Sequence, residues 1–295
     1  MLIKTKNFSD SQLNRFRDLQ RLSFEILEGM AASLKPGDTE KTVTRALVKQ
    51  YRKAGANGFF HLPVALFGER TALPGDWKTG HFFPRDREIK QNDSVVLDAS
   101  PLFDGYMVDT SYSFCYGENP EHAAMMAKLE QFRAQVCDAV NAGHTFKAIA
   151  DQIAGDITDM GYEPVHTKHP GEVLGHRAIK TVKLPFTWRI KGFDGLSLGW
   201  FIMKGKAVQS GLSKGPPTWN YHDTSDHPPL DGLWLVEPHA GDGPVGAKWE
   251  EILVIQDGKA HWLDDDTPHM RQWQQIRAGQ SYRPQAQRHA PAHTP

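Results

Sequence analysis

The sequence predicts an α+β fold built from two related halves, each consisting of two helices followed by short strands. The prediction depends on apolar residues at helical spacing over 11–34 and 39–53, and on a similar order of helices over 119–143 and 145–160. Short apolar runs bounded by Gly, Pro or Asp predict the strands. We therefore expect one domain over residues 1–275, with a curved antiparallel sheet between the helices.

Start and stop signals support the individual helices. Gly55 follows the second helix of the first half, where the apolar spacing ends. In the second half, Asn119 is placed to cap a helix whose first residue is Pro120, and Gly143 lies at its end. Gly161 ends the next helix in the same way.

Two aspartates lie on what we predict to be a hairpin over residues 95–109. Two apolar strands are joined there by a turn at Asp104-Gly105, and Asp98 and Asp109 stand eleven positions apart. Residues on one face of neighbouring antiparallel strands converge, and two converging carboxylates repel each other unless a cation lies between them. A single Asp is more often a turn or strand-edge residue, so the inference depends on residues further along the chain.

Three more candidate ligands follow these two aspartates. His169 stands beside a Pro-Gly turn, Glu237 ends an apolar strand and Glu250 begins another. Together with Asp98 and Asp109 they form a hard, oxygen-rich set of four carboxylates and one imidazole. Such a set suits two divalent ions (manganese, cobalt, iron or zinc) that share carboxylates, and does not suit a structural zinc site built from thiolates.

The order of these residues resembles that of the pita-bread metallohydrolase superfamily, which includes methionine aminopeptidase, Xaa-Pro aminopeptidase, prolidase and creatinase. The turn Asp104-Gly105-Tyr106 and the hydroxyl residue Thr110 after the second Asp match the pattern as well. The resemblance covers about residues 10–265. It implies the pita-bread fold, with two pseudo-symmetric halves, and a dinuclear centre whose ligands are Asp98, Asp109, His169, Glu237 and Glu250.

The resemblance also indicates catalytic residues. His176 stands seven positions after His169, and His81 stands seventeen before Asp98 in a His-x-x-Pro sequence, as in the family. A metal-bridging hydroxide would attack an amide carbonyl, because coordination lowers the pKa of water to roughly 7. We expect Glu237 to take and pass on the proton, His176 to stabilise the oxyanion or orient the carbonyl, and His81 to contact the amide or leaving group.

Composition narrows the range of partners and locations. The net charge is −1 and 39% of the residues are hydrophobic, so the chain has neither the basic surface of a nucleic-acid-binding protein nor an apolar run long enough to span a bilayer. The polar N-terminus has no signal-peptide pattern, which predicts a cytoplasmic enzyme. The two cysteines of the chain cannot supply a disulfide framework. A homodimer is a further expectation, since several family members pair.

Two segments differ from the rest. Residues 192–231 are rich in Gly, Pro and Trp, and we interpret them as an insertion dominated by turns. Its end would be either a loop over the site, with Trp219, Tyr221, His222 or His227 contacting substrate, or a surface elaboration with no such contact. Residues 280–295 are rich in Pro, Gln and His without periodicity, which predicts a disordered tail.

Other features depart from the peptidases of the family. About 60 residues precede the metal-binding region, so we expect the chain to lack the N-terminal domain of prolidases and Xaa-Pro aminopeptidases. Lys248 stands where the peptidase branch commonly has an Arg, and a lysine cannot form the planar bidentate pair with a carboxylate.

Several functions remain open on this basis. The first is a dinuclear aminopeptidase: the separation of thirteen positions between Glu237 and Glu250 favours the Xaa-Pro type, and the chain length favours the Met type. The second is a creatinase-like hydrolase or lyase acting on a small amide or amidine, and the third is a binding module without catalysis. A mononuclear iron oxygenase is the most distant, because it would leave most of the carboxylates without a role.

Overall fold

The computed structural model describes residues 2–182, 189–190 and 193–280. The predicted tail at 280–295 lies, apart from its first residue, outside the described residues. Two helices precede the first strands of the central sheets, α1 (Asp10–Ser33) and α2 (Glu40–Lys53). Ser9 caps α1 and Thr39 caps α2, each by accepting a hydrogen bond from the backbone of the third helical residue. Both predicted helices are confirmed.

The second half begins with three helices where the sequence predicted two. They are α3 (Pro120–Leu129), α4 (Gln131–Asn141) and α5 (Phe146–Asp159). Asn119 caps α3 as expected. The prediction of one continuous helix up to Gly143 is wrong, because the helix breaks at Glu130, whose carbonyl accepts a tight hydrogen bond from the Arg133 amide three residues on. Neither Gly nor Pro marks this break in the sequence.

The predicted hairpin forms the centre of the first sheet. In the order β3 (Val64–Phe67), β4 (Asp93–Ala99) and β7 (Thr110–Tyr116), all pairs are antiparallel. The hairpin continues beyond Ala99 as β5 (Pro101–Phe103) and β6 (Tyr106–Met107). Asp104 and Gly105 have φ angles of 50° and 85°, as a tight two-residue turn requires. The predicted turn is therefore confirmed.

A second antiparallel sheet contains the later strands. Its order is β13 (Thr218–Asn220), β9 (Val173–Arg177), β14 (Gly232–Val236), β17 (Glu251–Gln256) and β18 (Lys259–Trp262). Beside it, β15 (His239–Asp242) pairs with β16 (Val245–Lys248) and with β8 (Glu163–Pro164). A single bridge between Ser111 and Glu250 joins the first sheet to the start of β17. The two sheets thus meet where the candidate ligands lie.

Smaller strands complete the molecule. One further sheet has the strand order β1 (Ile3–Lys4), β10 (Lys180–Thr181), β6, β5 and β2 (Gly58–Phe59). In addition, β11 (Arg189–Ile190) pairs with β12 (Phe193–Asp194). Short 3₁₀ turns lie at Gly68–Ala72 (η1), Thr79–Phe82 (η2), Val165–Lys168 (η3) and Asp223–Ser225 (η4).

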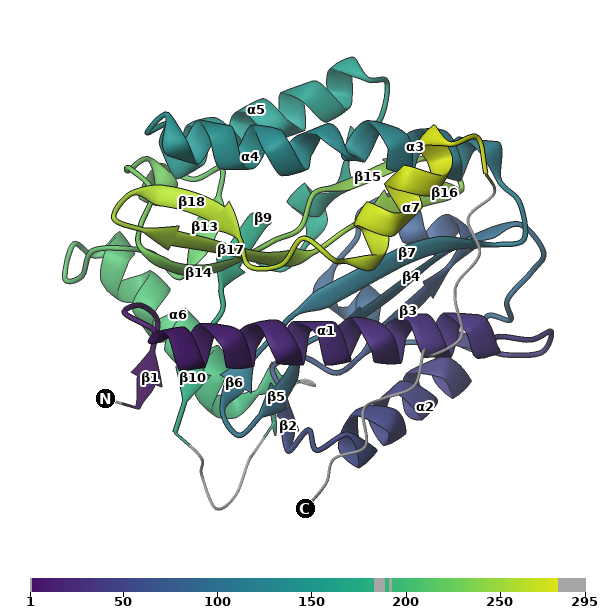
Figure 1. Cartoon of the computed structure of the whole chain (residues 1–295), viewed down its shortest axis with the longest axis horizontal. Coiled ribbons are helices and arrows are strands. Elements are labelled where there is room, and N and C mark those ends of the chain that lie inside the picture. Colours follow the sequence, from purple (N-terminus) through teal and green to yellow (C-terminus); the bar gives the residue numbers. More distant parts are fainter. Residues whose placement is uncertain (1, 183–188, 191–192, 281–295) are drawn as a thin grey trace.

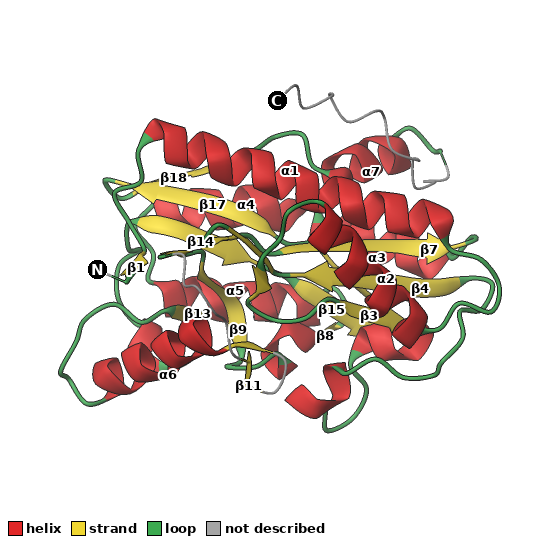
Figure 2. Cartoon of the chain, turned by 90° about the horizontal axis from the view of Figure 1, so that it is seen from below, coloured by secondary structure: helices red, strands yellow, loops and turns green. Residues whose placement is uncertain are grey.

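Helices cover the strands on both sides. Helices α1 and α2 lie along one side and α4 and α5 along the other, with the sheets between them (Figure 1). The view from below shows α1 running beside the strands of both sheets, with α7 (Pro268–Arg277) beyond it (Figure 2). One apolar core forms beneath α1 and α2, and a second beneath α3, α4, α5 and α7. This arrangement confirms the α+β class, and each core fixes one half of the strands that meet at the ligands.

The segment 192–231 contains more regular structure than the sequence predicted. Residues Gly195–Gln209 form helix α6, capped by Asp194, and Thr218–Asn220 form β13. Trp219 is completely buried, where it stacks on Phe146 with ring centroids 4.1 Å apart and donates its indole N–H to the Phe146 carbonyl. The interpretation of Trp219 as a substrate contact is therefore wrong.

Nowhere in the described chain is a helix both long and apolar enough to cross a bilayer.

Candidate metal centre

All five predicted ligands lie at the junction of the two sheets. Asp98 is on β4, and Asp109 immediately precedes β7. Glu237 follows the last residue of β14, and Glu250 precedes the first residue of β17, which pairs with β14. His169 caps the C-terminal end of η3. Strand pairing therefore sets the spacing of the four carboxylates. Each carboxylate stands at or next to the end of a strand, and the paired strand fixes the position of that end.

The ligand atoms form three overlapping groups within which they lie no more than 4.8 Å apart. The groups are His61 with Asp98 and Asp109, Asp109 with His176 and Glu250, and Asp98 with Glu237 and Glu250. All four predicted carboxylates belong to at least one group. His169 belongs to none of these groups, and its Nδ1 lies 2.8 Å from Glu237 Oε2.

Several carboxylate oxygens in this centre have unmet bonding capacity. Asp109 and Glu250 are each only 1% exposed. Within the described residues, Asp98 Oδ1, Asp109 Oδ1 and Glu250 Oε1 are buried and accept no hydrogen bond. Burial of a carboxylate without a partner is costly, so such oxygens mark the place of a cation. The donor set of carboxylates and imidazoles suits a divalent transition metal ion.

Lys248, at the end of β16, places its ammonium group among the carboxylates. Its Nζ lies 2.7 Å from Asp98 Oδ2, 2.9 Å from Glu237 Oε2 and 3.2 Å from Glu250 Oε2. The Lys248 side chain is only 2% exposed. Burial alone would lower the pKa of Lys248, but the three carboxylates raise it well above its usual value. The sequence marked this residue only as a departure from the family, without its place in the centre.

His61 is a residue of the centre that the sequence did not indicate. It lies in the loop before β3, and its Nε2 is 3.3 Å from Asp109 Oδ2 and 3.5 Å from Asp98 Oδ1. Its Nδ1 lies 2.9 Å from the Leu62 carbonyl, to which it can only donate. No spacing rule pointed to His61, although it stands three residues before Val64, the residue that pairs with Asp98.

A chain of hydrogen bonds orients His169. Its Nε2 lies 3.0 Å from His239 Nδ1, and His239 Nε2 lies 2.7 Å from the Thr71 carbonyl. The carbonyl can only accept, so His239 carries its proton on Nε2 and accepts at Nδ1 the proton of His169 Nε2. His169 Nδ1, which faces Glu237, is thereby left for a proton or a cation. His239 is thus the partner that fixes His169.

His176 faces the centre from β9. Its Nε2 lies 3.5 Å from Asp109 Oδ2, and its ring packs against Phe60 and Phe201, with centroids 5.6 and 5.7 Å away. Phe201 belongs to α6, so the segment 192–231 does reach this side of the centre, through a helix. The insertion therefore supplies an apolar contact to a predicted catalytic residue.

His81 belongs to none of the three ligand groups. It is part of η2, where its Nδ1 accepts a hydrogen bond from the Lys78 amide and its ring contacts Trp77. The neighbouring Phe82 ring packs at 5.8 Å from His169. The role of His81 therefore stays a prediction.

The charges of the centre are strongly coupled. Burial opposes the charged form of Asp109, yet His61 and His176 hold the pKa of its carboxyl well below the usual range. Burial and the charge of Asp109 raise the pKa of Glu250 well above its usual value. Against the effect of burial, Asp109 and Asp98 raise the pKa of His61 to about 9. With the described residues alone, Glu250 is therefore the carboxyl of the centre whose charged form is most strongly disfavoured.

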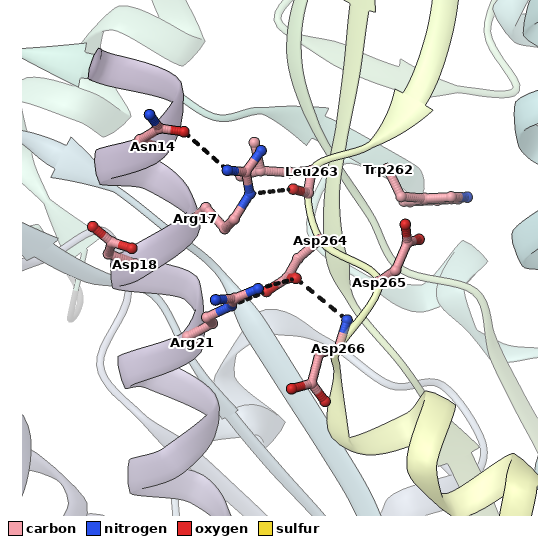
Figure 3. Close-up of a pocket in the computed structure, with 9 residues that line it drawn as sticks. All are labelled: Asn14, Arg17, Asp18, Arg21, Trp262, Leu263, Asp264, Asp265 and Asp266. Atoms are coloured by element: carbon pink, nitrogen blue, oxygen red, sulfur yellow. Dashed lines mark hydrogen bonds and ion pairs between the residues drawn. The ribbon is translucent and has the colours of Figure 1, made fainter. Parts of the chain in front are cut away.

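A hollow of about 800 Å³ opens elsewhere on the surface, between α1 and the segment after β18 (Figure 3). Arg21 of α1 forms a two-point ion pair with Asp264 there, and Arg17 donates to the Leu263 carbonyl. None of the predicted site residues lines it.

The comparisons with known proteins agree with the geometry. Curated relatives include uncharacterized peptidases of Staphylococcus saprophyticus (25% identical over 171 residues) and of Staphylococcus aureus strain RF122 (26% over 169 residues). Each alignment covers 57% of this chain and 46% of the relative, so the chain spans about half of their length.

Solved structures show the same fold at low sequence identity. An X-Pro aminopeptidase of Thermotoga maritima matches with a TM-score of 0.63 and 17% identity, over 89% of this chain and 62% of that one. For a dipeptidase of Pyrococcus horikoshii the TM-score is 0.62, with 17% identity over 88% and 61%. An Xaa-Pro dipeptidase of Bacillus anthracis gives 0.62 and 18%, over 90% and 62%.

These likenesses confirm the pita-bread type of fold that the sequence predicted. The model of the metallopeptidase family M24 matches residues 14–195, which is more than half of the sequence and includes Asp98, Asp109, His169 and His176. The family consists of hydrolases, as predicted. The chain belongs to metallopeptidase family M24.

Proposed function

We propose that this protein is a metal-dependent aminopeptidase that hydrolyses the amide bond after the N-terminal residue of a peptide, of the Xaa-Pro or the Met type. The observation that carries the proposal is the buried junction of four carboxylates and two imidazoles with unpartnered oxygens. Family membership and neighbours named as X-Pro aminopeptidase and Xaa-Pro dipeptidase support the same substrate class. Cytoplasmic location and a homodimer stay predictions from the sequence.

The residues present fit a divalent metal ion. Asp98, Asp109 and Glu250 offer buried oxygens, with His61 and His176 beside them. Manganese, cobalt, iron or zinc bound there would lower the pKa of a coordinated water to roughly 7 and polarise a carbonyl. The dinuclear form predicted from the sequence would also employ His169 and Glu237, and it requires the Lys248 ammonium to leave its observed position.

The residues of the chain itself would divide the remaining work. Glu237 is held at 2.8 Å by His169 and at 2.9 Å by Lys248, so its carboxylate is fixed in position to receive a proton from water and return it to the leaving nitrogen. His176, packed against Phe60 and Phe201, would direct its Nε2 edge to the scissile carbonyl and stabilise the developing charge. His81 would contact the substrate beyond the leaving nitrogen.

A second function is a hydrolase or lyase of the creatinase kind, acting on a small amide or amidine. The observation that favours it is the apolar cluster of Phe60, Phe193 and Phe201 beside His61 and His176, which narrows the space next to the centre. A small planar substrate fits beside such rings more readily than an extended peptide does.

One assay separates the two functions. Dipeptides and tripeptides with Met, Ala or Xaa-Pro at the N-terminus, together with creatine and simple amides, are offered to the metal-free protein and to protein loaded with manganese, cobalt, iron or zinc. We expect metal-dependent release of the free N-terminal amino acid. Turnover of the small amides alone would replace the aminopeptidase by the creatinase-like function, and no turnover with metal bound would contradict both.

A further inference from the structure

The geometry points to a mixed centre that holds one divalent cation and one ammonium group, with Lys248 standing in place of a second metal ion. The inference rests on the proposed metal-dependent function and changes its ion count from two to one. It also assigns a ligand role to His61. Four observations carry it: the fixed position of Lys248, the oxygens that it uses, the oxygens that it leaves free, and the orientation of His61.

Backbone contacts hold Lys248 in place. It pairs with His239 across β15 and β16, its amide donates to Ser113 Oγ at 2.9 Å, and Ser113 Oγ donates to its carbonyl at 2.7 Å. The amide and the carbonyl of Lys248 are therefore both hydrogen-bonded. The Lys248 side chain is itself only 2% exposed, so it cannot change its conformation as freely as a surface lysine does.

The ammonium group occupies the space that one metal ion would need. The three carboxylates within 3.2 Å of Lys248 Nζ are Asp98, Glu237 and Glu250, which together make up one of the three candidate ligand groups. A divalent transition metal lies about 2.0–2.2 Å from carboxylate oxygens. An ion bound to these three oxygens would overlap with Nζ, so the two cannot be present together.

The carboxylates divide their oxygens between two places. Asp98 and Glu250 each give one oxygen to Lys248, and the second oxygen of each accepts no hydrogen bond from any described residue. Asp109 makes no contact with Lys248 and has an unpartnered oxygen as well. His61, Asp98 and Asp109 form a ligand group of their own, and the free oxygens of the two aspartates make it a second position, next to the ammonium group, that is open to one cation.

His61 completes this second position. Its Nδ1–H donates to the Leu62 carbonyl at 2.9 Å, so Nε2, which faces Asp98 and Asp109, is left for a proton or for a cation that displaces it. A backbone acceptor for one ring nitrogen is the usual arrangement of a metal-bound histidine. The corresponding distances of His176 are longer: 3.3 Å to the Arg177 carbonyl, and 3.5 and 4.0 Å to Asp109 and Glu250. We therefore assign His61 as the ligand.

The charges agree with one ion. Two divalent ions together with Lys248 would place three cationic groups side by side in one buried space, where like charges repel strongly. One ion and the ammonium group place only two cationic groups among the four carboxylates. His169 and Glu237 then form a pair of their own at 2.8 Å beside Lys248, and His169 positions Glu237 instead of binding the ion.

The stoichiometry of the full-length, metal-free protein tests the inference without any assay of turnover. Manganese is titrated in by equilibrium dialysis, bound metal is measured by mass spectrometry, and the electron paramagnetic resonance spectrum is recorded. We expect one tightly bound manganese per chain, with the six-line spectrum of an isolated ion. Two ions per chain with a spin-coupled spectrum, or none, would overturn the inference. Peptide turnover that fails while one ion is bound would count against the proposed function alone.

Two variants sharpen the test. Lys248→Met removes the ammonium group, so it should bind a second manganese, and its melting temperature should rise further with manganese concentration than that of the wild type. Lys147→Met is the matched control, because Lys147 lies in an exposed pair with Asp151. A Lys248→Met protein that still binds one ion with unchanged affinity would contradict the inference.

Loss of the lysine also leaves carboxylates uncompensated, so a second comparison covers the case in which Lys248→Met does not fold. His61→Ala should weaken manganese binding at least tenfold, whereas the exposed His261→Ala should leave it unchanged. Equal affinities in these two variants would remove His61 from the ligand set and overturn the assignment.

Discussion

Two carboxylate-rich regions of this molecule differ in how their oxygens are satisfied. In the surface hollow, both oxygens of Asp264 accept hydrogen bonds from Arg21, and one also accepts the Asp266 amide (Figure 3). In the buried centre, Asp98 and Glu250 each have one oxygen bonded to Lys248 and one with no partner among the described residues. Arginine saturates a carboxylate with its two-point geometry, whereas a single ammonium group cannot.

This difference distinguishes a structural ion pair from carboxylates that are available to a ligand. The Asp264 pair joins α1 to the segment after β18, and both oxygens of Asp264 are occupied. The junction of the two sheets has buried carboxylate oxygens without a partner among the described residues, and a bound cation would meet their requirement. The Asp264 pair is therefore a structural contact, and the junction is the candidate site.

The largest effect should come from Asp109, which belongs to two of the three ligand groups. Asp109→Asn keeps the shape of the side chain but removes its charge. We expect bound manganese to fall below a tenth of that in the wild type and turnover to fall by a factor on the order of 1,000 or more. Unchanged metal content in this variant, measured by mass spectrometry, would sink the ligand assignment.

His176 gives the next largest effect, because it is assigned to the substrate and not to the ion. His176→Ala should retain bound manganese and lose a factor of about 100 to 1,000 in kcat, as expected for the loss of one group that stabilises an oxyanion. Metal content and steady-state kinetics are measured on the same preparation. A variant that loses its metal would move His176 into the ligand set.

His122, a buried histidine outside the centre, shows how burial alone shifts the pKa of an imidazole. Burial lowers the pKa of His122, on α3, to about 4, while the aspartates raise that of His61 to about 9. The unfolded chain binds a proton at His122 with a pKa near 6.5, so this contribution to stability is complete above that pH and is lost as the pH falls toward 4. Between pH 7 and pH 5 the loss is about 2 kcal/mol.

Urea unfolding at these two pH values checks the expectation. His122→Leu should reduce the decrease in the free energy of unfolding between pH 7 and pH 5 by that amount. An identical pH dependence in the wild type and in the variant would contradict the burial of a neutral imidazole at His122. Titration of other groups cancels in the comparison, since they are common to both proteins.

The smallest effect on metal binding and turnover should come from the hollow. Arg21 is 47% exposed, but its partner Asp264 is only 4% exposed and would lose two hydrogen bonds. Arg21→Met should therefore lower the free energy of unfolding by about 1–3 kcal/mol and leave metal binding and turnover unchanged. A marked loss of activity in this variant would show that the hollow serves the substrate.

Much of this molecule follows from local sequence patterns. The approximate extents of α1 and α2, the Asn119 cap of α3, the Asp104-Gly105 turn and the positions of Glu237 and Glu250 at strand ends were predicted, because each depends on a few neighbouring residues. The break at Glu130 could not be predicted, since the residues around it are good helix formers.

Residues brought in by tertiary packing escaped prediction for another reason. His61 lies 37 positions before Asp98 and reaches it only because β3 pairs with β4. Lys248 was noted as an unusual residue, but its direction depends on the pairing of β16 with β15 and on the bond to Ser113. The burial of Trp219 against Phe146 likewise depends on contact between α5 and β13. Such contacts have no signature in spacing.

The most direct test of the central claim, that the junction of the sheets is a cation site, is an anomalous-scattering map of crystals soaked in manganese. The account predicts a peak within bonding distance of Asp98, Asp109 and His61 Nε2, with Lys248 still in place beside it. A map without a peak at this junction, from crystals that hold manganese elsewhere, would contradict the account.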